Sequence, residues 1–308
     1  MAMTYSDTLN YLGVLMQIKA NRTGFLSFLG GLNPGSYASY GSFLFPLSQE
    51  YELPAGSQPA ITEQASVTGA TATTQTRSQS TNTVQIFQEK YQVSYKKESG
   101  VQEFSGVQLA GQAVEPTSEM DFQRTAALGR VALDMDYSFL NGSYQAASDT
   151  ATAAKTRGLA TAITSNAVDA SSADLSKDLI NTLLVSMKGY SDLDMPVMFG
   201  GAFQKTKISD IYGFAPQSLN IGGVNVTTVV TDFGSFNYVE CLQLAASTLI
   251  IADASKLRPV FCPVSGQLII DEPLAKTGAS DSGQIYTQAG LDYFNEKFHG
   301  KITNLTTS

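Results

Sequence analysis

The residues that most often carry out chemistry in enzymes are scarce in this sequence. Its 308 residues include one histidine, His299, which lies in the polar run NEKFHGK close to the C-terminus. Hydrolysis by a Ser-His-Asp or Cys-His arrangement needs an imidazole between a nucleophile and a group that orients it. The polar surroundings of His299 do not favour such a role.

Metal and phosphate chemistry also lack their usual residues. Cys241 and Cys262 are far apart without metal-ligand spacing, so we expect two buried, reduced thiols. No phosphate-binding glycine motif occurs, and Gly200–Gly201 is typical of a plain strand-to-helix turn. Asp134 and Asp136 lie two residues apart in a helical stretch and do not share a face, so we expect them to be solvated or in an interface. We predict no enzyme activity, cofactor or metal site.

The composition favours a protein covered by copies of itself. Charged residues make up 15% of the chain, against roughly 25% in an average soluble protein. A secreted adhesin or a pilus subunit would have a similar composition. The formal net charge is −8, and no basic cluster exists beyond Lys96–Lys97, whereas nucleic-acid-binding proteins present a basic face. Any contact with nucleic acid is therefore expected to be non-specific.

Targeting signals are not visible in the sequence. The N-terminus lacks a cationic segment followed by an apolar one, so no secretory signal peptide is expected. No run of about eighteen apolar residues exists, so no membrane span is expected either.

The first hundred residues resemble an arm followed by a projecting hairpin. A β-type run covers Ser42–Leu53, and the polar segment Ala55–Asn82 follows, with Glu63 and Arg77 as its only charges. This segment cannot bury enough apolar area to fold alone, so it is either a disordered linker or a β-arm awaiting partners. A strand-like run, TVQIFQEKYQVSYKK, resumes at once and favours the arm. Its apolar alternation is carried by Val84, Ile86, Tyr91, Val93 and Tyr95.

The rest of the chain predicts a mixed α+β protein. A helix of about 24 residues should begin at the cap Ser118-x-x-Asp121 and end at Asn141–Gly142. Its apolar stripe is Leu128, Val131, Ala132, Met135 and Phe139. Further helices are predicted at about Ser172–Lys188, capped by Ser171, and at about Ala202–Tyr212. Short strands are predicted at Met195–Phe199, Val224–Val230, Thr248–Ile251, Pro259–Phe261 and Gln267–Ile270, with strands around a turn in Gln284–Leu305.

The order of these elements resembles that of HK97-fold major capsid proteins of tailed phages, particularly the SU10-type group. The matching motifs are TNTVQIFQEKYQVSYKKESGV (Thr81–Val101), ALDMDYSFLNG (Ala132–Gly142), TRGLATAI (Thr156–Ile163) and NEKFHGKITNL (Asn295–Leu305). The resemblance implies an N-arm (1–41), an extended E-loop hairpin with its flanking strands (42–97), a P-domain with a long spine helix (98–144), an A-domain (145–255) and final strands that return to the P-domain (256–308).

The resemblance also implies a function. Such subunits assemble themselves into pentamers and hexamers of an icosahedral shell around double-stranded DNA, in the bacterial cytoplasm, with portal, scaffolding and decoration proteins as partners. We hypothesise that seven residues lie in subunit interfaces: Glu63, Thr73, Thr74, Arg77, Ile86, Phe87 and Arg157. The alternatives are an encapsulin-type nanocompartment shell, or another phage structural protein such as a tail tube or adhesin.

Two departures limit what the resemblance implies. The HK97 shell is cross-linked through an E-loop lysine, whereas no lysine lies between Lys19 and Lys90 here. A long N-terminal scaffolding domain, present in some relatives, is also missing. We therefore expect a shell held by non-covalent contacts, with scaffolding supplied by a separate protein or by a segment that a protease has removed.

Overall fold

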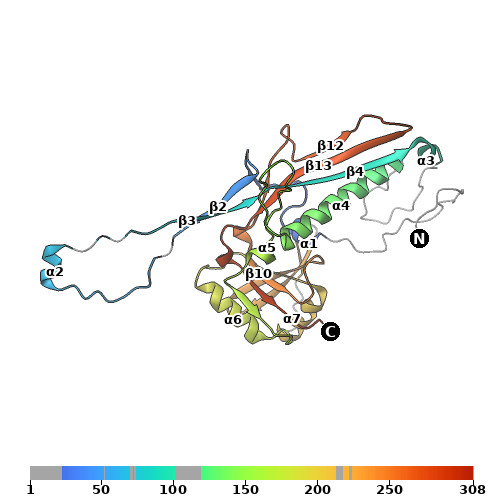
Figure 1. Ribbon diagram of the computed structural model, residues 1–308. Helices are drawn as coiled ribbons and strands as arrows, with labels where there is room; N and C mark the ends of the chain where they lie inside the picture. Colours follow the sequence, from blue (N-terminus) through green and yellow to red (C-terminus); the bar gives the residue numbers. More distant parts are fainter. Residues whose placement is uncertain are drawn as a thin grey trace.

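The structure is a computed structural model that describes residues 23–51, 53–69, 72, 74–100, 119–212, 218–221 and 224–307. The described chain forms two β-sheets, several helices, and a thin two-stranded ribbon that extends far from the body (Figure 1). The α+β class predicted from the sequence is therefore confirmed.

The five-stranded sheet is organised around one long strand, β13. One edge of β13 pairs antiparallel with β4, while its other edge pairs first with β12 and then with β11, and β1 adds to β11 in parallel. The bounds are β1 Ala38–Ser39, β4 Gln85–Ser94, β11 Arg258–Phe261, β12 Ile269–Pro273 and β13 Ser280–Asp292. We call this unit the first sheet.

Helix α4 (Glu119–Asn141) packs against the first sheet because one of its stripes is apolar. Val131, Met135 and Phe139 are buried, whereas Leu128 is half-buried. The ring of Phe139 contacts that of Phe87 on β4 edge-on, with centroids 6.5 Å apart. The predicted helix and its end are confirmed, whereas the predicted cap residue Ser118 lies outside the described residues.

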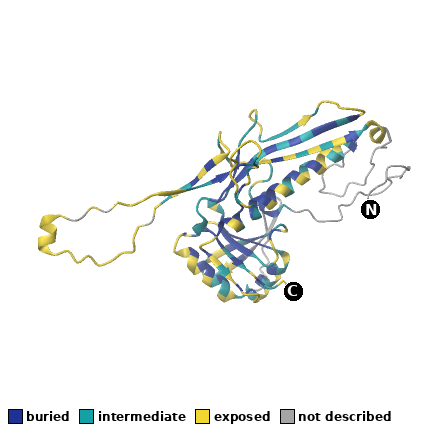
Figure 2. Cartoon of the chain, in the orientation of Figure 1, coloured by how far each residue is buried: buried dark blue, intermediate teal, exposed yellow. Residues whose placement is uncertain are grey.

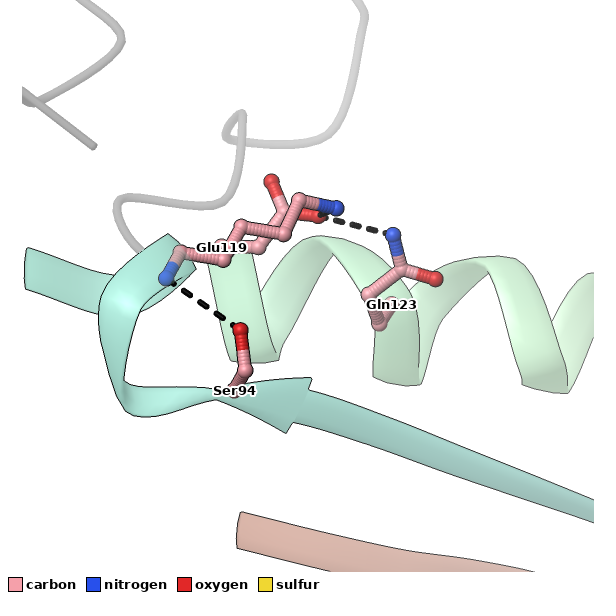
Figure 3. A network of polar contacts seen from close by, with 4 residues as sticks. Ser94, Glu119 and Gln123 are labelled. Carbon is pink, nitrogen blue, oxygen red and sulfur yellow. Dashed lines mark hydrogen bonds and ion pairs between the residues drawn. The ribbon is translucent and has the colours of Figure 1, made fainter. Parts of the chain in front are cut away.

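Polar contacts fix the N-terminal end of α4 to the neighbouring turn. Helix α3 (Tyr95–Gly100) directly follows β4, and its Lys97 forms an ion pair with Glu119. Glu119 also accepts a hydrogen bond from Gln123 at 2.8 Å, and Ser94 accepts one from the Lys97 backbone at 3.3 Å (Figure 3). The negative Glu119 in the first turn also interacts favourably with the helix dipole.

The seven-stranded sheet forms a second, more compact unit that we call the second sheet. Its strand order is β5-β14-β10-β6-β9-β8-β7, and helices α6 and α7 pack against it (Figure 1). The strand bounds are β5 Ala167–Asp169, β6 Pro196–Gly200, β7 Ser218–Ile221, β8 Val224–Thr231, β9 Gly234–Glu240, β10 Leu249–Asp253 and β14 Gly300–Thr303. Buried side chains of α6 and the sheet make its core: Ile180, Leu183, Leu184, Met187, Met198, Phe236, Leu249, Ile251 and Ile302.

The start and the cap predicted for one helix of this second unit were wrong. Helix α6 is Lys177–Lys188, and Ser176, not Ser171, caps it by accepting a hydrogen bond from the Leu179 N–H. Ser171 has a positive φ of 50°, which is incompatible with a regular helix start. Helix α7 (Ala202–Tyr212) has the predicted bounds.

The final strands do not all return to the first sheet as expected for 256–308. Strands β11, β12 and β13 do, but β14 pairs with β10 and β5 in the second sheet. The reason is apolar burial: Ile302 on β14 is fully buried opposite Leu249. The chain therefore passes between the two sheets three times: from β4 to β5, from β10 to β11 and from β13 to β14.

A short helix, α1 (Gly24–Phe28), is anchored between these units. Phe25 and Leu26 are buried, and the Leu26 N–H donates to the Asp136 carboxylate at 2.7 Å. Asp136 is fully buried, so the expected solvated or interface role is wrong for this residue, while Asp134 is exposed. Burial raises the pKa of Asp136 to about 6, although hydrogen bonds from the α1 backbone oppose the shift.

Candidate assembly surface

The segment between β2 (Leu44–Glu50) and β3 (Ser78–Thr83) is the most unusual surface of the molecule. We call residues 51–77 the projecting loop; it extends far from both sheets (Figure 1). Every described residue from Tyr51 to Gln79 is exposed, whereas the body contains two buried hydrophobic cores (Figure 2). No described part of its own chain covers this loop.

A two-stranded stalk carries the projecting loop. Strands β2 and β3 pair antiparallel from Leu44 opposite Thr83 to Glu50 opposite Ser78, with a register shift between Pro46 and Gln49. Phe45 is fully buried at the base, and its ring stacks on Tyr40 with centroids 5.6 Å apart. The stalk is thus fixed at its root and free at its far end.

Helix α2 (Glu63–Thr68) lies at the far part of the loop. The Thr62 hydroxyl caps it by accepting a hydrogen bond from the Ala65 N–H at 3.2 Å, and Glu63 is in its first turn. The composition predicted an extended segment here, so this helix was not predicted. The signal that could have found it is a threonine cap followed by Glu-Gln-Ala, all compatible with a helix.

The loop exposes large apolar side chains, and their exposure does not stabilise an isolated subunit. Tyr51, Leu53 and Ile61 are 63–65% exposed, and Val67 on α2 is 85% exposed. Single exposed apolar residues are common, but four along one projection indicate a surface that a partner covers. The projecting loop is therefore the first component of the candidate assembly surface.

Asn82 fixes the root of the stalk. Its side-chain N–H groups donate to the Leu291 carbonyl at 2.8 Å and the Arg157 carbonyl at 3.2 Å, while its oxygen accepts from the Arg157 N–H at 2.8 Å. Asn82 is fully buried, so these bonds satisfy groups that water cannot reach. Asn82 was not predicted as a functional residue, although an asparagine inside a strand is itself uncommon.

The motif TRGLATAI lies at the same root. Gly158 permits the close approach of this segment to the end of α4, because a Cβ there would meet the Gly142 nitrogen at 2.5 Å. The Gly158 N–H donates to the Gly142 carbonyl at 2.8 Å, and the Thr156 hydroxyl accepts from the Leu291 N–H at 3.3 Å. The motif therefore joins α4, the stalk and β13. Its last residues form the short helix α5 (Leu159–Ala162).

A cleft of about 620 Å³ opens beside this root. Glu50 of β2 accepts a hydrogen bond from the Asn295 side chain at 2.6 Å, and the Arg157 guanidinium lies 4.8 Å from the centre of the Tyr144 ring. Glu296 accepts hydrogen bonds from Ser165 and its neighbour; burial alone would raise its pKa, but these bonds lower it. The cleft is lined by side chains of both charges and by apolar surface, which suits contact with protein.

The predicted interface residues divide into three groups. Glu63, Thr74 and Arg77 lie on the projecting loop and are exposed, and Ile86 is 48% exposed on β4. Phe87 is a wrong prediction: it points into the core against Phe139, because the buried alternation of β4 runs through the odd-numbered residues. Two further residues complete the set: Arg157 lines the cleft at the root, and Thr73 lies outside the described residues.

His299 and the two cysteines make contacts within the folded chain and lie outside the candidate assembly surface. His299 is fully buried, not solvated, and one ring nitrogen lies 2.9 Å from the Tyr293 carbonyl. Burial lowers its pKa to about 4, so the ring is neutral near pH 7. Both cysteines are free; Cys241 is buried as expected, whereas Cys262 is half-buried and donates to the Tyr40 carbonyl.

Among the described residues, no group of three or more His, Cys, Asp or Glu side chains could hold a metal ion. Within the same ranges, no helix combines the length and the hydropathy needed to cross a membrane.

Comparison with known proteins gives a consistent result. The family model described as SU10 major capsid protein matches residues 2–306. The cyanophage A-1(L) capsid asymmetric unit is similar in structure, with a TM-score of 0.62 and 11% identity over 96% of each chain. The holo-SrpI encapsulin complex from Synechococcus elongatus PCC 7942 has a TM-score of 0.60 and 8% identity, covering 98% of this chain and 94% of that one. No curated protein matches the sequence. At these identities the structural likeness shows a shared HK97-like fold.

Proposed function

This chain belongs to the SU10 major capsid protein family, and on that premise we propose that its subunits join into pentamers and hexamers of an icosahedral shell around phage double-stranded DNA. The chain is a structural protein of the capsid shell in the phage virion. The likeness to an encapsulin reflects the common fold, while the family match distinguishes the phage shell from that alternative.

The observation that carries the proposal is the projecting loop. It holds Tyr51, Leu53, Ile61 and Val67 exposed, on a stalk whose root is rigidly bonded by Asn82. A segment that is held out but covered by nothing of its own finds its partner in another subunit. Standard protein interfaces bury about 1,200–2,000 Å² in total, and a loop of this length supplies a large part of that area.

We assign the parts of the chain to the elements of the HK97 fold as follows. The E-loop with its flanking strands is 42–97, which contains β2, the projecting loop, β3 and β4. The N-arm (1–41) includes α1, the P-domain (98–144) contains α4, and the A-domain (145–255) contains most of the second sheet. The region 256–308 returns to the P-domain through β11–β13 and re-enters the A-domain through β14.

Membership of this family also suggests the partners of the shell. We propose that the shell binds portal, scaffolding and decoration proteins and that it assembles in the bacterial cytoplasm. Contact with packaged DNA is non-specific, in keeping with a net charge of −8. Because no lysine lies between Lys19 and Lys90, the contacts of the projecting loop are non-covalent.

The test is to replace residues 53–76 with a four-residue Gly-Ser link. Glu50 lies directly opposite Ser78, so a short turn can close the stalk without disturbing β2–β3 pairing. The shortened subunit should keep its circular dichroism spectrum and its unfolding midpoint. In sedimentation and negative-stain microscopy it should form no shells, whereas the full chain forms them.

A matched control separates the loss of contacts from a change in length. A variant of full loop length, with Leu53, Ile61 and Val67 all changed to Ser, should also be folded and should assemble poorly. Normal shells from the shortened chain would contradict the role of the loop. A full chain that forms no closed shells under any assembly condition, with its natural partners added, would contradict the proposed function itself.

A further inference from the structure

Strand β4 has one open edge within the described part of the chain. It pairs with β13 over ten consecutive residues, 85–94 opposite 280–289, without a register shift. The Tyr95 N–H donates to the Ala279 carbonyl, so the odd-numbered residues bond to β13 in this antiparallel ladder. The even-numbered residues therefore direct their backbone N–H and C=O groups away from β13: Ile86, Gln88, Lys90 and Gln92.

This edge lacks the usual protection against pairing. Proteins blunt edge strands with prolines, bulges, several charges or a covering helix. Strand β4 has no proline or bulge, and Lys90 is the only charge among its outward residues. Helix α4 lies against the odd-numbered face, where Phe87 contacts Phe139 and Glu89 pairs with Arg130. The side chains of all four even-numbered residues are exposed.

The projecting loop contains one segment suited to this edge. Its outgoing leg, 53–61, includes Pro54 and Pro59, which cannot donate backbone hydrogen bonds and disfavour a strand. Its return leg, 74–77, reads Thr-Gln-Thr-Arg, has no proline and is fully exposed. Threonine favours extended backbone, and no described residue pairs with the backbone of this leg.

We propose that the return leg (74–77) of one subunit adds as a strand to the open edge of β4 in a second copy. The inference rests on the proposed function and specifies which element of the neighbour receives the loop. The loop extends away from β4 of its own chain (Figure 1), so the pairing requires a second subunit. Backbone hydrogen bonds supply the attraction, as in other cases of strand addition.

A proline test separates backbone pairing from side-chain contact. Lys90→Pro and Gln88→Pro each remove one outward N–H and none of the bonds to β13. The matched controls, Lys90→Ala and Gln88→Ala, remove the side chains and keep the N–H groups. We expect the proline variants to be folded by circular dichroism and to form no shells in sedimentation, while the alanine variants assemble. Proline variants that assemble like the unchanged chain would overturn the inference.

A second measurement uses the unchanged protein, so it does not depend on a variant that folds. Backbone hydrogen exchange is compared between free subunits and purified shells. On assembly, exchange should slow more than tenfold both in 74–77 and at the even-numbered amides of β4. Unchanged exchange in either segment overturns the inference while leaving the shell itself, and thus the proposed function, intact. Absence of shells from the unchanged chain would instead count against the proposed function.

Discussion

The projecting loop and helix α4 differ in where their side chains find partners. Met135 and Phe139 of α4 are fully buried by their own chain, and the charges of α4 pair with Glu89 and Asp271. The loop has comparable apolar residues, yet its described residues are all exposed. One polypeptide thus contains a region whose side chains are buried within the subunit and a region whose side chains are buried only in the proposed assembly. The following substitutions test that division, in order of decreasing effect on the isolated subunit.

Met135→Ala should have the largest effect. The side chain is fully buried between α4 and the first sheet, and its truncation leaves a cavity. We expect the free energy of unfolding to fall by about 2–5 kcal/mol. Urea denaturation of the unassembled subunit measures this loss. An unchanged midpoint would show that α4 does not contribute to the core, and the contrast between α4 and the projecting loop would then be wrong.

Asp136→Asn should have a smaller effect that depends on pH. The pKa of Asp136 is raised to about 6 in the folded subunit, above the ordinary value of 3.8. A raised carboxyl pKa favours the protonated form, so the unchanged chain loses stability as the pH rises through about 6. The asparagine variant has no carboxyl at this position, so it does not show this loss of stability.

The stability of Asp136→Asn relative to the unchanged chain should therefore increase by about 1–3 kcal/mol between about pH 4.5 and pH 7.5. Paired urea titrations at the two pH values give this difference. Asp134→Asn is the control, because that carboxyl is exposed on the same helix and should show a smaller change. An equal change in both variants would show that burial of Asp136 is not the cause.

Asn82→Ala tests the root where the two regions meet. Its removal leaves the Leu291 carbonyl and both backbone groups of Arg157 without their side-chain partner. We expect a loss of about 1–3 kcal/mol in unfolding free energy. Asn82→Asp keeps the acceptor and loses the donor, so it should differ from alanine. A loss in assembly alone, without a loss in stability, would show that Asn82 contributes to assembly, as proposed for the loop, and not to the stability of the subunit.

Val67→Ser should have the smallest effect on the isolated subunit. Val67 is 85% exposed on α2, so the change in unfolding free energy should lie within about 0.5 kcal/mol. The same substitution should raise the subunit concentration at which shells first form. Light scattering against concentration measures that threshold. A destabilised subunit would indicate that the loop folds back onto its own chain.

Local patterns in the sequence predicted the elements better than their partners. The stripe through Val131, Met135 and Phe139 was sufficient to predict α4, because helical periodicity reflects burial directly. The interface prediction was wrong at Phe87, because Ile86 and Phe87 are both apolar and only tertiary packing decides which of them points inward. The start of α6 was wrong because Ser172 bonds to Asn304, far away in the sequence.

The candidate assembly surface was predicted only in part for the same reason. The projecting loop could be predicted because its composition cannot support a core. The root could not, because Asn82, Arg157 and Leu291 meet only after folding. Asp136 was expected to be solvated or in an interface, and the polar neighbours of His299 gave no sign of its burial. Sequence context says little about burial that depends on distant strands and helices.

The two-stranded stalk has a mechanical consequence. An icosahedral shell of pentamers and hexamers, as proposed for this chain, requires neighbours to meet at more than one dihedral angle, at fivefold and at sixfold positions. A ribbon of two strands twists and bends more readily than a five-stranded sheet backed by a helix. The register shift between Pro46 and Gln49 adds a local point of bending near the root. In the proposed shell the stalk would therefore be the part of the subunit that bends, so that curvature changes between neighbours while each body stays rigid.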